Sequence, residues 1–74
     1  MSRPYLSPRQ RDCVRLAAAG LEQRHIADRL GLKFGTVRIH LTDARKLLGA
    51  RNTAHAAALA VHHGIVTAEH LELP

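Results

Sequence analysis

The 74-residue chain has few aromatic side chains, one cysteine and no long hydrophobic run. Histidine aside, Tyr5 and Phe34 are its aromatic residues. The core must therefore consist mainly of Ala, Leu, Val and Ile, which favours a small core between helices. The single cysteine, Cys13, excludes an internal disulfide and fits a reducing compartment. A transmembrane helix needs about 18 consecutive apolar residues, and a signal peptide needs an apolar core that this N-terminus lacks. These absences predict a small, soluble, cytoplasmic protein of one domain.

Charge is distributed unevenly along the chain. Residues 1–51 contain all eleven Lys and Arg residues and four acidic residues, a net charge of +7. Residues 52–74 contain two glutamates and no Lys or Arg, a net charge of −2. Side chains that served only to solvate the protein would not be segregated in this way. The pattern therefore predicts a basic surface that binds a polyanion and a second surface with a different role.

Capping signals and apolar spacing predict an all-α fold of four helices. Ser7, Pro8 and Gln10 form a capping box with proline at the first helical position, and Gly20 ends this helix. The other predicted helices span about 22–30, 34–48 and 53–63, each followed by a glycine. Residues 67–71 could add one short helical turn.

The second and third predicted helices have the spacing of a helix-turn-helix. Ala27 supplies a small side chain where two steeply crossed helices approach, and Gly31 tolerates the positive φ of a sharp turn. Val37 then anchors the next helix against the first. This spacing predicts that the helix at 34–48 is presented outward, toward the major groove of DNA.

Several separated blocks of sequence resemble the LuxR-type helix-turn-helix domain, also called the FixJ, NarL or GerE type. The blocks are Leu6–Asp12, Gly20–Leu21, Ile26–Leu32, Thr36–Leu41, Lys46–Ala50 and Arg51–Asn52. The resemblance implies a three-helix core plus a fourth helix, over residues 1–66, with a short tail at 67–74. It also implies binding to double-stranded DNA, usually as a dimer through the fourth helix on inverted half-sites. Because only a five-residue lead precedes the domain, we expect a free-standing regulator that lacks a sensor domain.

The resemblance implies that Arg38, Ile39 and Thr42 face DNA bases. Helical spacing agrees, because these residues lie opposite the apolar stripe of the same helix. The Arg38 guanidinium can donate two hydrogen bonds to guanine, and Ile39 can contact a thymine methyl group. Phe34 is an aromatic residue where the family usually has a charge. We expect it either to contact bases or sugars at the groove edge or to be shielded by the segment around Tyr5.

A further set of side chains is predicted to contact phosphates, which positions the domain without reading sequence. The set is Arg24, Lys33, Thr36, His40, Arg45, Lys46 and Arg51. His40 could instead pack beside the second helix. Lys33 replaces the serine that the family usually has before the recognition helix, and a cation there opposes the helix dipole at a cost of about 0.3–1 kcal/mol. A lysine that meets phosphates would recover this loss on binding.

The fourth predicted helix is apolar over most of its circumference, so it needs burial on more than one side. One side can pack on the domain, and the other predicts contact with a second chain. The predicted dimer interface is Ala54, Ala58, Val61, His62 and Ile65. The alternative is that the tail from Val66 onward folds back over this helix.

Other functions find little support in the sequence. The six histidines show no ligand spacing with cysteine or acidic residues, so we expect no metal. Asp12, Asp28 and Asp43 lie on separate predicted helices, which argues against catalysis, and we expect no cofactor, small-molecule ligand or membrane contact. Two alternatives to a homodimeric regulator remain: promoter recognition like that of sigma factor region 4, and heterodimerisation with another regulator. The Thr36–His40 block argues against the sigma-like reading.

Overall fold

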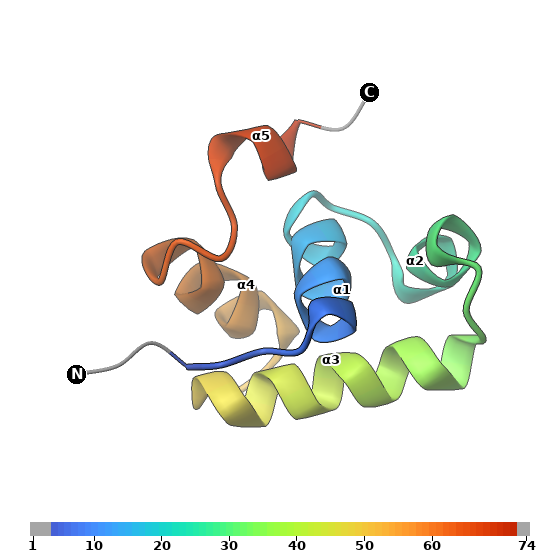
Figure 1. Ribbon diagram of the computed structural model, residues 1–74, viewed down its shortest axis with the longest axis horizontal. Coiled ribbons are helices and arrows are strands. Elements are labelled where there is room, and N and C mark those ends of the chain that lie inside the picture. The colour runs from blue at the N-terminus through green and yellow to red at the C-terminus, as the bar shows by residue number, and fades with distance from the viewer. Residues whose placement is uncertain (1–3, 73–74) are drawn as a thin grey trace.

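The computed structural model describes residues 4–72, which form helices and no strand. The helices are α1 (Pro8–Ala18), α2 (Gln23–Leu30), α3 (Phe34–Leu48), α4 (Thr53–His62) and α5 (Ala68–Leu71). Helix α1 lies at the centre, α3 runs along one side of it, and α2 and α4 lie near the two ends of α3 (Figure 1). The predicted all-α class, the four helices and the short final turn are confirmed. None of these helices, within residues 4–72, is long and apolar enough to cross a membrane.

The predicted capping box opens α1. The Gln10 amide N–H donates to the Ser7 hydroxyl at 3.2 Å, and the Ser7 amide N–H donates to the Gln10 side-chain oxygen at 2.9 Å. Leu6, which directly precedes the cap, is 2% exposed and belongs to the core. The cap therefore fixes the direction in which the N-terminal segment enters the domain.

Within residues 4–72, α3 supplies four of the fourteen buried hydrophobic residues of the core, more than any other helix. The predicted stripe of α3 is buried along its whole length: Val37, Leu41, Ala44 and Leu48. Cys13 and Val14 of α1 pack in the same cluster. Burial raises the pKa of the Cys13 thiol, the Asp12 carboxylate raises it further and Arg9 opposes the rise. The thiol thus stays protonated and serves as a small core side chain.

The predicted helix-turn-helix is present in α2 and α3. Gly31 ends α2 in the left-handed conformation, with φ at +67°, and the Leu32 amide N–H donates to the Ala27 carbonyl at 2.9 Å. These features form a Schellman-type end, which reverses the chain within two residues. Ala27 and Val37 are both buried, as the spacing predicts. Figure 1 shows α2 nearly end-on while α3 lies across the view, so the two helices cross steeply.

One predicted contact, that of Ile65, is wrong because of the path of the chain after α4. The sequence predicts Ile65 at the dimer interface, but in the structure it is 8% exposed and packs in the domain's own core. The reason is the turn at Gly64, with φ at +75°, after which the Ile65 amide N–H donates to the Ala60 carbonyl at 2.8 Å. The Arg15 side chain also donates to the Ile65 carbonyl at 2.9 Å. The apolar spacing that suggested a helical stripe continued past the end of the helix.

Residues 66–72 of the tail do not cover the outer face of α4, contrary to the alternative above. Within the described part of the chain, α5 packs against α1 and makes no contact with α4. Val66, just before α5, is buried in the core. No segment within residues 4–72 therefore covers the outer face of α4.

Candidate nucleic-acid interface

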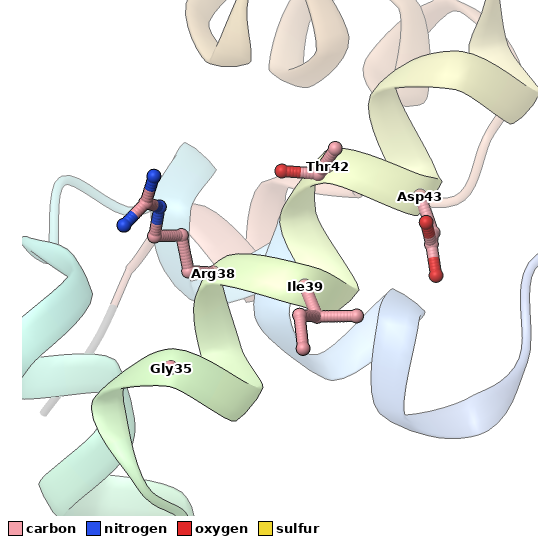
Figure 2. A pocket seen from close by; sticks show the side chains of 5 residues that line it. All are labelled: Gly35, Arg38, Ile39, Thr42 and Asp43. Carbon is pink, nitrogen blue, oxygen red and sulfur yellow. The ribbon is translucent and has the colours of Figure 1, made fainter.

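The outer face of α3 carries a hollow of about 430 Å³. Its lining residues are Gly35, Arg38, Ile39, Thr42 and Asp43. Figure 2 shows them on successive turns of α3. Arg38, Ile39 and Thr42, which are predicted to face DNA bases, thus line one hollow. Gly35 and Asp43 join them.

Gly35 and Asp43 were not predicted as site residues. Each carried a signal in the sequence, because Gly35 is a glycine inside a helix and Asp43 is the one acidic residue of α3. A carboxylate on this basic helix face repels phosphates, whereas it accepts hydrogen bonds from amino groups such as that of cytosine. Both residues therefore suit contact with base edges.

Ile39 and Phe34 are large apolar side chains that the fold leaves in water. Ile39 is 62% exposed at the hollow, and Phe34 is 48% exposed at the start of α3. Tyr5 is 78% exposed, and the N-terminal segment runs near the opposite end of α3 (Figure 1). Of the two alternatives for Phe34, shielding by the segment around Tyr5 is therefore wrong for the described residues, 4–72. Neither aromatic ring contributes to the core.

The N-terminus of α3 has no side-chain cap. Lys33 occupies the N-cap position, no acidic residue lies in the first turn, and the Thr36 and Val37 amides both donate to the Lys33 carbonyl. Helix α2 likewise starts at Glu22 without a side-chain cap. Both helices of the helix-turn-helix thus begin with backbone N–H groups that no side chain satisfies.

The side chains predicted to contact phosphates differ in their solvent exposure and in their hydrogen bonds within the chain. Arg24, Lys33, Lys46 and Arg51 are exposed, and Thr36 and His40 are half-buried. Arg45 has a structural bond, because its guanidinium donates to the Ala50 carbonyl at 3.1 Å and closes the C-terminal end of α3. Among residues 4–72 the one ion pair joins Arg9 and Asp12 at 3.5 Å. The cations of α3 are therefore not neutralised by acidic groups of the described chain.

The outer face of α4 carries small apolar side chains and one histidine. Ala54, Ala58, Val61 and His62 are exposed there, Val61 to 47%. The helix contains no Lys, Arg, Asp or Glu. Its inner face, Ala56 and Ala60, packs in the core. The inner side of α4, which packs on the domain, is thus separate from the outer side predicted to contact a second chain, apart from Ile65.

Two further features bear on other kinds of site. A second hollow of about 490 Å³ lies between α1, α2 and α5, with side chains of both charges in its lining. Within residues 4–72 no group of three His, Cys, Asp or Glu residues is placed to hold a metal ion.

Taken together, the steep α2–α3 crossing, the buried anchor at Val37 and the exposed, basic outer face of α3 define a helix-turn-helix domain. The family model described as bacterial regulatory proteins, luxR family, matches residues 4–60. The chain therefore belongs to the LuxR family of bacterial regulatory proteins.

Named relatives are regulators of transcription. The chain is 39% identical over 62 residues to the transcriptional regulatory protein MctR of Rhizobium johnstonii, a match that covers 84% of this chain and 29% of MctR. It is 34% identical over 62 residues to the transcriptional activator protein TraR of Rhizobium radiobacter, covering 84% and 26%. It is 38% identical over 61 residues to the transcriptional activator protein BjaR1 of Bradyrhizobium diazoefficiens, covering 82% and 25%. The chain thus spans less than a third of the length of these relatives.

Proposed function

We propose that this chain binds double-stranded DNA sequence-specifically, as a homodimer on an inverted repeat, and regulates transcription. The observation that carries the proposal is the outer face of α3, where Arg38, Ile39 and Thr42 share one hollow. Exposed cations flank that face, and relatives are named as transcriptional regulators and activators. The enzyme alternative draws no support from these names.

The proposed docking places α3 in the major groove. The groove admits one α-helix, and side chains on the outward face of that helix reach base edges. Arg38 would donate two hydrogen bonds to a guanine, while Lys33 and Lys46 would contact phosphates on either side of the groove. Phe34, at the first position of α3, would contact a sugar or a thymine methyl at the groove edge. Release of counterions from these phosphates makes the affinity fall steeply with salt.

The proposed dimer uses the outer face of α4. A two-fold interface needs one patch that is complementary to itself, and a face of two alanines, one valine and one histidine packs on its copy without burying Lys, Arg, Asp or Glu. Ala54, Ala58, Val61 and His62 form this patch. The dimer would present two α3 helices to half-sites one helical turn apart, about 10 base pairs between centres.

Selection from a pool of random duplexes with the purified chain tests the proposal. We expect enrichment of an inverted repeat, together with binding that weakens as salt rises. An enriched single half-site would support DNA reading without the α4 dimer. The absence of any enriched sequence would overturn the proposed function.

A second candidate function rests on the same apolar face of α4. The chain could heterodimerise with another regulator through Ala54, Ala58 and Val61 and so change that regulator's DNA binding. Failure of the selection, combined with co-purification of a regulator from the host cell, would favour this role.

A further inference from the structure

Gly35 is a glycine that the fold of this chain does not require. The other four glycines, Gly20, Gly31, Gly49 and Gly64, have positive φ values, whereas Gly35 has an ordinary helical backbone. A Cβ atom added at Gly35 would meet no atom of the chain within 4 Å. Glycine in the middle of a helix costs about 0.5–1 kcal/mol relative to alanine, and at Gly35, the second residue of α3, part of this cost applies. Neither conformation nor internal packing offsets this cost.

Gly35 lies in the lining of the hollow on the outer face of α3. Figure 2 shows it as bare ribbon, one turn before Ile39 and beside Arg38. The missing side chain lets a ligand approach the α3 backbone closely, which is a recurrent use of glycine. A Cβ at this position would take up part of the hollow.

The chemistry of the lining favours one kind of occupant. Most of the surface of the hollow is apolar, with the Ile39 side chain and the bare Gly35 backbone in its lining and Arg38, Thr42 and Asp43 beside them. A phosphate would meet the Asp43 carboxylate, so the DNA backbone is a poor occupant. Among the base edges in the major groove, the thymine 5-methyl group is the apolar feature.

We infer that the hollow receives the 5-methyl group of a thymine, with Gly35 and Ile39 in contact with it. This inference rests on the proposed function and deepens it, because it names a base in the target sequence. Arg38 lines the same hollow, so the thymine would lie next to the guanine that Arg38 reads. Gly35 is then a specificity-determining residue.

Replacement of thymine by deoxyuridine, which lacks the methyl group, tests the inference in the duplex that the wild-type chain selects. Deoxyuridine at one thymine of the half-site should weaken binding about fourfold, the value of one buried methyl-sized group. Deoxyuridine outside the half-sites is the control and should change nothing. Ile39→Ala should abolish the discrimination between thymine and deoxyuridine.

Gly35→Ala gives the second arm of the test. The added methyl group should weaken binding to the thymine duplex about tenfold, because it competes for the hollow. The same substitution should weaken binding to the deoxyuridine duplex much less than binding to the thymine duplex, because the thymine methyl group with which the added methyl group clashes is absent. Thermal unfolding should show that the variant is at least as stable as the wild type.

The outcomes separate the inference from the proposed function. If no duplex is enriched, the proposed function fails. If a duplex is enriched but its half-site has no thymine next to a guanine, or if deoxyuridine binds equally at every position, the inference is overturned. Undiminished binding of Gly35→Ala to the thymine duplex would also overturn it.

Discussion

Helices α3 and α4 begin in opposite ways. Helix α4 starts at Asn52, whose side-chain oxygen accepts the His55 amide N–H at 2.8 Å. Helix α3 starts at Lys33, whose side chain caps nothing and places a cation at the positive end of the helix dipole. The same division holds for the other long helices, because α1 has a capping box and α2 has no side-chain cap.

This division follows role rather than position in the chain. The capped helices α1 and α4 form the scaffold, and the uncapped helices α2 and α3 form the helix-turn-helix. A side-chain cap stabilises a helix by about 1 kcal/mol, so its omission from both motif helices is a local cost. Locally unfavourable choices concentrate where function competes with folding. The difference supports α3 as the helix that meets an anion.

The outer faces of the two helices differ in the same sense. Helix α3 presents Arg38 and Lys46 with one acid, whereas α4 presents alanines and Val61 with no Lys, Arg, Asp or Glu. Each helix packs its inner face on the same core. One face is thus suited to a polyanion and the other to a second apolar surface.

Val61→Glu tests the proposed role of the outer face of α4 as a dimer interface, and it is the substitution from which we expect the largest effect. The proposed dimer would bury two carboxylates without partners, which should weaken it by more than about 3 kcal/mol, or over 100-fold. Val61 is 47% exposed, so the monomer should stay folded. Sedimentation should show a monomer. Leu71→Glu on α5, 43% exposed and away from α4, is the matched control and should remain dimeric; a dimer in Val61→Glu would refute the α4 interface.

Arg38→Ala tests the proposed reading of DNA bases by the outer face of α3. Loss of the bidentate contact should cost about 1–3 kcal/mol of specific binding and relax the preference at one base pair. Competition between the selected duplex and single-base variants measures both effects. Arg38→Lys keeps the charge but not the bidentate geometry, so it should lose selectivity with a smaller loss of affinity. Unchanged selectivity in both variants would remove Arg38 from base reading.

The helix-turn-helix could be predicted from the sequence because its signals are local. The Ala27, Gly31 and Val37 spacing and the stripe of α3 describe contacts between neighbouring elements, and each was confirmed. The prediction for Ile65 failed because helical spacing was extended past Gly64, where the chain turns back. A periodic pattern does not by itself mark where a helix ends.

The hollow on α3 could be predicted only in part. Helical spacing placed Arg38, Ile39 and Thr42 on one face, but it gave no account of Gly35, whose importance lies in empty space beside it. The bond from Arg45 to the Ala50 carbonyl was also missed, because it depends on how the chain leaves α3. Contacts that depend on the path of the backbone after a helix cannot be predicted from helical spacing and are seen only in the structure.

Two substitutions, one that adds a cap to α3 and one that removes the cap of α4, test why the two helices begin differently. Lys33→Ser should stabilise the domain by about 1 kcal/mol, since it adds a cap and removes an unfavourable cation. The same variant should bind DNA more weakly, because a phosphate contact is lost. Asn52→Ala is the counterpart and should destabilise the domain by about 1 kcal/mol without changing the salt dependence of binding. Thermal unfolding and salt titrations measure these effects; a Lys33→Ser variant that binds more tightly would contradict the proposed role of Lys33.

Lys46→Ala tests the weakest contact in the comparison. Lys46 is exposed on α3, and its proposed partner is a phosphate, so its loss should weaken binding to selected and unrelated duplexes by similar factors. The slope of log affinity against log salt should become shallower by about one, which corresponds to one phosphate fewer. Arg29→Ala is the matched control, because Arg29 is an exposed cation that lines the hollow beside α5 instead of the face of α3. If both variants flatten the slope equally, the effect comes from overall charge. If only Lys46→Ala does so, the basic face of α3 is the surface that meets the DNA backbone.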